Sequence, residues 1–255
     1  MNSTPHVLVT GGAGYLGSIL VPTLLARGCA VTVVDNFLYG QTSLLDCCAY
    51  ENFAIVRGDI RDERLMLPLL KKADVVMPLA CLVGAPLCAQ KPIEARSINL
   101  DAILMLLKNA SKAQRFISPT TNSGYGVGQA GVFCTEETPM NPISLYGVLK
   151  VELEKALLAA GAVSLRLATV CGVSPRMRLD LLVNDFTYRA VVDRFVVLFE
   201  AHFKRNYIHV RDVARAFCHA LDHFETMQGQ PYNVGLSDAN LSKMELCQEI
   251  QKQIP

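Results

Sequence analysis

The sequence predicts an α/β fold, in which a doubly wound parallel sheet with helices on both faces is followed by a smaller C-terminal lobe. Short runs rich in β-branched residues alternate with segments of helical length up to about residue 170, which is typical of parallel sheets. Four glycines lie within seven residues between the first strand and the first helix. The second strand ends in an acidic residue, Asp35.

The regular alternation covers the first 172 residues, which we expect to form one domain. The expected strands lie at 7–10, 30–35, 53–57, 75–79, 115–118 and 163–170. The expected helices lie at 15–26, 42–48, 61–72, 93–109 and 144–160, and a loop rich in Gly, Thr, Pro and Asn fills 119–142. In such sheets ligands bind at the carboxyl ends of the strands, so the loops that follow strands should carry the function.

The alternation becomes irregular past residue 172, and we expect residues 173–255 to form a smaller lobe that is interleaved with the first domain. The expected elements are helices at 178–190 and 213–221, strands at 195–199, 207–209 and 232–234, and a last helix. Ser242 and Glu245 have the spacing of a capping box, which would open that last helix.

Composition limits the possible functions. The formal net charge of +1 over 255 residues argues against a nucleic-acid binder. No apolar run reaches transmembrane length and no secretory segment precedes the first strand, so we expect a cytoplasmic protein without a membrane partner. The nine cysteines include no CxxC pair and should be free thiols. The histidines show no metal-ligand spacing, and we expect no metal site.

The glycine-rich turn has the pattern of a dinucleotide-binding loop. Gly12, Gly14 and Gly17 satisfy G-x-G-x-x-G, and Gly11 adds a second reading, G-x-x-G-x-x-G. Glycine lets the backbone approach a pyrophosphate, which then faces the N-terminus of the following helix. The confirming context is an acid about 20 residues further on, and Asp35 supplies it. Because a carboxylate there would bind a ribose diol and repel a 2′-phosphate, we expect NAD rather than NADP.

A second motif places Tyr146 and Lys150 at i and i+4, on one face of a helix. A free tyrosine, with a pKa near 10, is a poor base at neutral pH. A nearby lysine cation stabilises the phenolate and lowers that pKa. The tyrosine can then exchange a proton with a sugar hydroxyl while a hydride moves to or from the cofactor.

Over nearly its whole length, the chain resembles the extended short-chain dehydrogenases/reductases of the nucleotide-sugar epimerase/dehydratase group. The resemblance lies in the TGGAGYLG loop, Asp35-Asn36, Gly58-Asp59-Ile60, Leu79-Ala80, Asn99, the TTNSGYG loop at 120–126, Tyr146/Lys150 and RNYIHVRD at 205–212. It implies a Rossmann-type domain that binds NAD, an NDP-sugar substrate and a homodimer formed by the helices near 93–109 and 144–160.

The same resemblance implies roles for individual residues. Thr121 would assist Tyr146 and Lys150 in catalysis. The expected cofactor contacts are Gly11, Gly14, Tyr15, Leu16, Gly17, Asp35, Asn36, Asp59, Ile60, Leu79, Ala80, Asn99, Tyr146 and Lys150. The expected substrate contacts are Thr169, Asn184 and Arg205, the last at the diphosphate.

Two departures from the family pattern bear on the reaction. Dehydratases of this group carry Asp-Glu directly after the Ser/Thr, whereas this chain has Asn122-Ser123. We therefore expect no dehydration. Relatives also continue well beyond the strand at 232–234, so we expect part of the substrate lobe to be absent.

The resulting hypothesis is NAD-dependent oxidation and epimerisation of a nucleoside-diphosphate sugar at C4, through a keto intermediate. A dehydrogenase that releases the keto sugar remains an alternative, as does a non-catalytic NAD-binding regulatory protein. A reductase of a non-nucleotide carbonyl compound is a third, and the RNYIHV segment argues against it. The base and the sugar cannot be read from the sequence.

Overall fold

The computed structural model describes residues 4–127 and 133–254, so residues 128–132 of the expected loop lie outside the described residues. Its centre is a seven-stranded parallel sheet in the order β3-β2-β1-β4-β5-β6-β9. The strands are β1 (His6–Thr10), β2 (Ala30–Asp35), β3 (Phe53–Arg57), β4 (Val75–Pro78), β5 (Arg115–Thr121), β6 (Val163–Leu167) and β9 (Pro231–Val234). The order reverses beside β1, which places a crevice at the carboxyl ends of β1 and β4.

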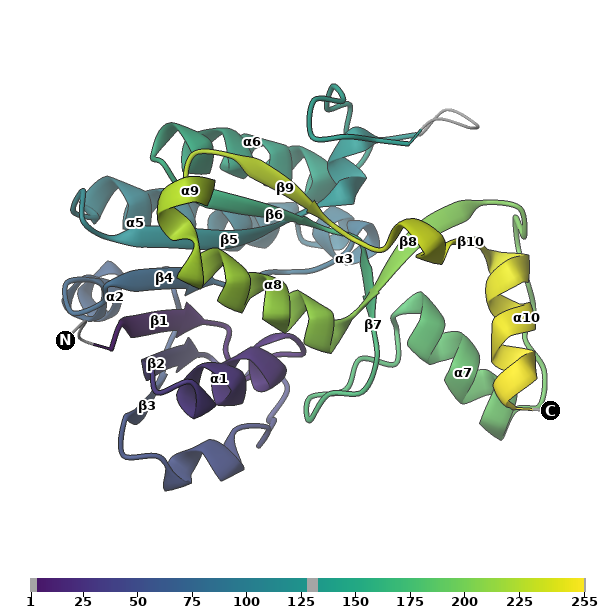
Figure 1. Ribbon diagram of the computed structural model, residues 1–255, viewed down its shortest axis with the longest axis horizontal. Helices are drawn as coiled ribbons and strands as arrows, with labels where there is room; N and C mark the ends of the chain where they lie inside the picture. The colour runs from purple at the N-terminus through teal and green to yellow at the C-terminus, as the bar shows by residue number, and fades with distance from the viewer. Residues whose placement is uncertain (1–3, 128–132, 255) are drawn as a thin grey trace.

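Helices cover both faces of this sheet, and each face has its own hydrophobic core (Figure 1). On one face α1 (Gly17–Ala26) and α8 (Val210–Asp222) bury Leu24 and Phe217 against the strands. On the other face α2 (Glu63–Leu70), α5 (Ala102–Asn109) and α6 (Leu145–Ala159) bury Met66, Ile103 and Leu153. The strands between two such layers are buried on both sides, which explains their near-continuous apolar sequence.

Local sequence sets where the helices begin. The Asp62 carboxylate accepts from two backbone N–H groups of the first turn of α2. The Ser144 hydroxyl accepts from the N–H of Gly147 at 3.1 Å and so fixes the start of α6. The expected capping box is confirmed, since Ser242 and Glu245 exchange hydrogen bonds at the start of α10 (Lys243–Gln253). Each cap satisfies a donor that the helix itself leaves free.

The smaller lobe contains a three-stranded sheet in the order β10-β8-β7, with α7 (Leu182–Val192) and α10 side by side against it (Figure 1). Its strands are β7 (Thr169–Cys171), β8 (Lys204–His209) and β10 (Asn240–Ser242). Phe186, Tyr207 and Leu246 form its core. After β8 the chain returns to the large domain, where α8 packs against α1 and β9 pairs with β6. The lobe is therefore interleaved with the large domain.

Two strand predictions were wrong. The expected strand at 163–170 is two strands, β6 in the large sheet and β7 in the small one, because the chain changes partner at Ala168, whose N–H donates to the Val234 carbonyl. Residues 195–199 form no strand. Arg194 and Glu200 adopt left-handed backbone conformations at the two ends, and the chain turns there. Exposure alternates along this apolar segment, so Val196 and Leu198 pack against the lobe core while the residues between and beside them are exposed.

The helix predictions differ in detail. The expected helix at 93–109 is α4 (Pro92–Arg96), a π-helical turn (Ser97–Asp101) and α5 in succession. The expected helix at 42–48 is a 3₁₀ turn, η1 (Leu45–Ala49). Elements without an earlier prediction are α3 (Ala85–Gln90), α9 (Phe224–Met227), β10 and the 3₁₀ turns η3 (Asn122–Tyr125) and η4 (Ser237–Ala239). These are short, and local periodicity carries little information over so few residues.

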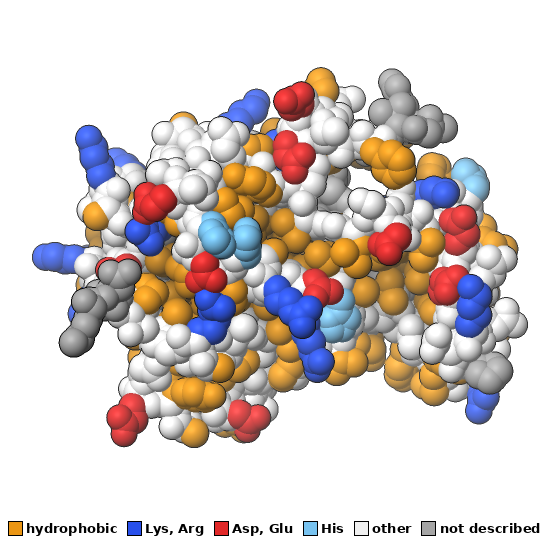
Figure 2. Space-filling model, in the orientation of Figure 1, with side chains coloured by type: hydrophobic (Ala, Val, Ile, Leu, Met, Phe, Trp, Pro, Cys, Tyr) orange, Lys and Arg blue, Asp and Glu red, His pale blue; other side chains and the backbone are white. Residues whose placement is uncertain are grey.

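The surface mixes charges of both signs. Figure 2 shows Lys/Arg and Asp/Glu side chains interspersed over the face seen in Figure 1, with hydrophobic side chains exposed between the large domain and the lobe. Within the described residues, no helix is long and apolar enough to span a bilayer. All nine cysteines are free thiols.

Candidate active site

A cleft of about 990 Å³ runs along the carboxyl ends of the central strands. Its walls come from the loop after β1, the loops after β2 to β5, the start of α6 and the segment between β7 and α7. The volume is at the upper end of the range for cofactor and ligand sites.

The glycine loop forms one end of the cleft. Gly11 has φ +69°, and a Cβ placed on it would lie 2.6 Å from the backbone of Ala80. A Cβ on Gly17 would collide with the backbone of Gly12. Both positions therefore need glycine to bring the loop, the strand and α1 this close together.

The N-terminus of α1 opens into the same end of the cleft. Leu16 occupies the N-cap position and makes no side-chain cap. Within the described part of the chain, the backbone N–H groups of Tyr15, Leu16 and Gly17 donate to no protein acceptor. Free N–H groups at the positive end of a helix are an anion-binding arrangement. This end of the cleft suits a pyrophosphate.

Asp35 faces the cleft from the end of β2 and is 7% exposed. One carboxylate oxygen accepts from the Ala13 N–H at 3.0 Å, and the other accepts from the Phe37 N–H at 2.8 Å and Gln41 Nε2 at 3.3 Å. The carboxylate thus connects the glycine loop to the loop after β2. It also keeps a negative charge where the ribose of a dinucleotide would lie.

The loops after β3 and β4 form the middle of the cleft wall. Asp59, Ile60, Leu79 and Ala80 all line it, as expected, and so does Asn36 beside Asp35. Asp59 is held by a two-pronged contact with Arg61, and hydrogen bonding from that guanidinium keeps the pKa of the Asp59 carboxyl below its usual range. An ionised carboxylate there can accept from an amino group.

Tyr146, Lys150 and Thr121 meet at the other end of the cleft. Burial raises the pKa of the Tyr146 phenol, and the neighbouring Cys81 and Cys88 add to the rise. Arg178 and a hydrogen bond from the Thr121 side chain act in the opposite direction. The net direction is opposite to the lowering expected from Lys150, because burial outweighs the cations that line the cleft.

Lys150 is almost fully buried, and its Nζ donates to the Pro119 carbonyl at 3.1 Å. This contact fixes the ammonium group against β5, one helical turn from Tyr146. The Thr121 hydroxyl accepts from the Ser123 N–H at 3.1 Å, which sets the orientation of the hydroxyl at the end of β5. The side chains of Lys150 and Thr121 are therefore held by backbone contacts, and Tyr146 lines the cleft beside them.

Two residues expected to contact ligands are withdrawn from the cleft. Asn99 has no exposed surface, and its amide bonds both the N–H and the carbonyl of Leu82. Asn184 is also buried and bonds the Gly172 N–H and the Arg178 carbonyl. Both amides bond backbone groups of loops beside the cleft, and neither lines it. The sequence could not distinguish contact with a ligand from support of a loop, because both roles place an amide near the cleft.

Other cleft residues were not predicted. Arg178 lines the cleft and forms an ion pair with Asp180, and Arg176 lies over the ring of Tyr39 at 4.0 Å to the ring centroid. Cys81 lies beside Lys150, and burial raises the pKa of its thiol. The two arginines could have been found from the sequence, because the segment Pro-Arg-Met-Arg at 175–178 follows the sixth predicted strand, where ligand-binding loops are expected.

The expected substrate residues Thr169 and Arg205 line the lobe side of the same cleft, with Arg178. Guanidinium groups bind phosphate oxygens through paired donors, so these arginines suit a second diphosphate. Among residues 4–127 and 133–254, no three His, Cys, Asp or Glu side chains gather as a set of metal ligands. The cleft thus has one end suited to a dinucleotide and another suited to proton transfer on a phosphorylated ligand.

A family model, described as the NAD dependent epimerase/dehydratase family, matches residues 7–235. The chain belongs to this family. The fit is seen in the molecule itself, because the glycine cradle, the free N–H groups at α1 and the carboxylate of Asp35 are the features that bind NAD. The protein is thus an NAD-dependent enzyme with a Rossmann-type fold, as the sequence predicted.

Individual relatives agree on the fold and differ in the reaction. A UDP-glucose 4-epimerase from Lactobacillus helveticus is 27% identical, over 96% of this chain and 81% of that protein. A UDP-N-acetyl-alpha-D-glucosaminuronate decarboxylase from Bacillus cytotoxicus is 29% identical, over 96% and 79%. Among solved structures, the UDP-glucose 4-epimerase of Thermus thermophilus in complex with NAD superposes with a TM-score of 0.83 at 27% identity, over 97% of this chain and 82% of that one.

The UDP-glucuronic acid 4-epimerase of Bacillus cereus, solved with UDP-glucuronic acid and NAD, superposes with a TM-score of 0.86 at 26% identity, again over 97% and 82%. The chain therefore spans about four-fifths of the length of these relatives.

Proposed function

We propose that this protein epimerises a UDP-sugar at C4 through a 4-keto intermediate. The observation that carries the proposal is the meeting of Tyr146, Lys150 and Thr121 in the cleft that Arg178 and Arg205 also line. One end of that cleft suits NAD, and the lobe end offers cations to a sugar diphosphate. The similarity to UDP-sugar 4-epimerases supports UDP as the nucleotide.

In this proposal Tyr146 takes the proton of the C4 hydroxyl and later returns it. Lys150 and Thr121 stabilise the phenolate, the first by charge and the second by a hydrogen bond. Bound NAD supplies the hydride acceptor for oxidation at C4 and the hydride for the return. Arg178 and Arg205 bind the diphosphate and leave the sugar free to present either face.

The structure argues against dehydration. Removal of water needs a base at C5 and an acid at the leaving hydroxyl, and Asn122 and Ser123 occupy the positions where dehydratases carry those groups. Glu136 and Glu137 lie further along the same loop and could replace these groups only from within the cleft, which neither of them lines. The Glu136 carboxylate accepts from the Asn233 N–H at 2.7 Å and its carbonyl accepts from Arg166, so it is held outside the cleft.

The test is a product analysis after incubation of the protein with NAD and a panel of UDP-sugars, with Tyr146→Phe as the inactive control. We expect a product of unchanged mass with inverted C4, seen by mass spectrometry and proton NMR. A product lighter by one water would indicate a dehydratase, and one lighter by H₂ with accumulation of NADH a dehydrogenase. Tight NAD binding without conversion of any UDP-sugar would favour a regulatory protein.

The state of the cysteines bears on the compartment in which the protein works. Free thiols at all nine cysteines suit a reducing environment, and we propose the cytoplasm as the place of the reaction.

A further inference from the structure

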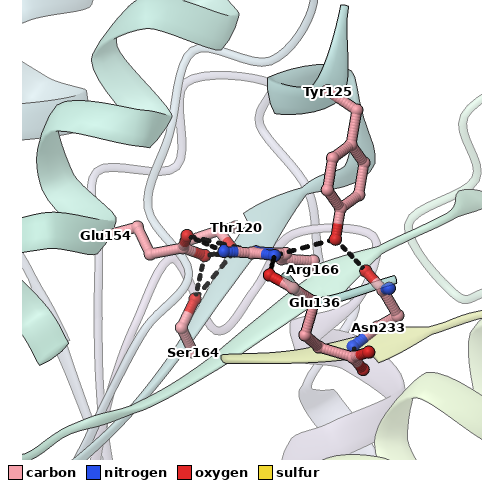
Figure 3. Close-up of polar contacts among 7 residues, drawn as sticks. All are labelled: Thr120, Tyr125, Glu136, Glu154, Ser164, Arg166 and Asn233. Carbon is pink, nitrogen blue, oxygen red and sulfur yellow. Dashed lines mark hydrogen bonds and ion pairs between the residues drawn. The ribbon is translucent and has the colours of Figure 1, made fainter. Parts of the chain in front are cut away.

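A buried ion pair behind the cleft joins the elements that carry the proton-transfer residues. Glu154 on α6 and Arg166 on β6 are each 6% exposed at the side chain, and Arg166 Nη2 donates to Glu154 Oε1 at 2.7 Å (Figure 3). The second carboxylate oxygen accepts from the hydroxyls of Thr120 at 3.0 Å and Ser164 at 2.7 Å. The carboxylate thus connects α6 to β5 and to β6.

The guanidinium group extends the network on the other side. Arg166 Nη1 donates to the Tyr125 hydroxyl and to the Glu136 carbonyl, both at 2.8 Å (Figure 3). Tyr125 in turn donates to Asn233 Oδ1 at 2.6 Å, on β9. Through these contacts the buried pair, which already joins α6, β5 and β6, is also connected to the turn after β5 and to the edge strand β9.

Glu154 lies on the same helix as Tyr146 and Lys150, so the ion pair also affects the position of these two residues. Tyr146, Lys150 and Glu154 are spaced four residues apart and follow one another along one face of α6. Lys150 bonds the Pro119 carbonyl, and Glu154 bonds the hydroxyl of the next residue, Thr120. Thr121 comes directly after them. Two successive anchors therefore fix the position of α6 along β5 immediately beside the residues that must exchange a proton.

We propose that Glu154 and Arg166 form a positioning unit, which holds Tyr146 and Lys150 in register with Thr121. The inference rests on the proposed function, because it assigns the unit to the proton transfer at Tyr146. A buried ion pair by itself is weak evidence for stability, since pairs of this kind can be replaced by neutral groups of similar volume at little cost. A misplacement of about 1 Å at a reacting group, in contrast, can lower the rate about 100-fold.

The experiment compares Glu154→Gln with the double variant Glu154→Gln/Arg166→Met, which leaves no unpaired buried charge. The matched control is Glu152→Gln, because Glu152 lies on the same helix, is 47% exposed and makes only a surface ion pair with Arg96. Thermal melting measures folding, and kcat, KM and the Kd for NAD measure function. We expect the double variant to melt closer to the wild type than Glu154→Gln, with kcat still lowered about 10- to 100-fold and KM and Kd unchanged.

A second readout needs no substrate. The pKa of the Tyr146 phenol is measured in the NAD-bound protein from its ultraviolet absorbance, with a Tyr146→Phe protein subtracted in each background. The charged and titratable groups that act on the phenol are Arg178 before α7, and Cys81 and Cys88 around α3. Lys150 lies one turn along α6 and lines the same cleft.

Loss of the Glu154 charge alone would favour the phenolate and lower the phenol pKa. Displacement of the phenol from Lys150 and Thr121 would raise it. We expect a rise in Glu154→Gln and in the double variant, and no change in Glu152→Gln.

The outcomes are separable. A double variant with the wild-type melting temperature and wild-type kcat would overturn the positioning role, as would a fall in the phenol pKa. If wild-type protein converts no UDP-sugar, the proposed function fails, and the phenol titration still decides the positioning role.

Discussion

Replacement of Asp35 by alanine tests how one carboxylate selects the cofactor. The substitution removes a negative charge from the cleft and three internal hydrogen bonds, from Ala13, Phe37 and Gln41. Two of these donors are backbone N–H groups at the glycine loop and at the end of β2. Without the carboxylate, water in the cleft is their remaining partner.

The magnitudes follow from these contacts. A buried donor that loses its acceptor costs about 1–3 kcal/mol, so two backbone donors set a loss of folding stability of about 2–6 kcal/mol, with the lower end favoured where the cleft admits water. A hydrogen bond to a charged acceptor contributes about 1.5–3 kcal/mol. Loss of that bond to the ribose of NAD therefore weakens NAD binding about 10- to 150-fold. NADP gains from the same change, because its 2′-phosphate no longer meets a carboxylate.

The assay is isothermal titration of both dinucleotides into wild-type protein, Asp35→Ala and the control Asp46→Ala. Asp46 is an exposed acid on η1, and its loss changes the net charge equally without touching the cleft. We expect the preference for NAD to fall by at least about 10-fold in Asp35→Ala only. An unchanged ratio of the two Kd values, or wild-type protein that binds NADP as tightly as NAD, would refute the reasoning.

Three further predictions concern other parts of the molecule. Tyr146→Phe should lower turnover by about 10²–10⁴-fold and leave NAD affinity near wild type, and a rate near wild type would exclude its role as the proton-transfer group. We expect a homodimer, because α5 carries Leu104 and Met105 that the single chain leaves partly exposed, and light scattering that finds a monomer at micromolar concentration contradicts this. Acid should weaken the fold partly through Glu154. Burial opposes its ionisation, but hydrogen bonds from Arg166 and Ser164 hold its pKa below the usual range. Its contribution is therefore complete above the unfolded carboxyl pKa, about 4.3, and is lost as pH falls through the folded value. In acid titrations followed by circular dichroism, Glu154→Gln should lose less stability than wild-type protein, and equal losses would show that this carboxyl does not contribute.

The sequence alone was sufficient for the features that depend on local chemistry. The glycine loop, Asp35 at the end of β2 and the Tyr146/Lys150 pair were all predicted, and all line the cleft. A strand–glycine–helix turn needs its residues at a fixed spacing, and an i, i+4 pair on a helix always shares a face. The capping box at Ser242 was predicted for the same reason, because both partners lie within one turn.

Tertiary structure decided what each buried polar side chain does. The amides of Asn99 and Asn184 each hold a loop beside the cleft, because the fold brings to them the backbone groups that they bond. Likewise, Glu154 on α6 gave no sign in the sequence of its partner Arg166 on β6. Their pairing, and with it the register of α6 beside β5, depends on the packing of a helix on a sheet, which no local spacing specifies.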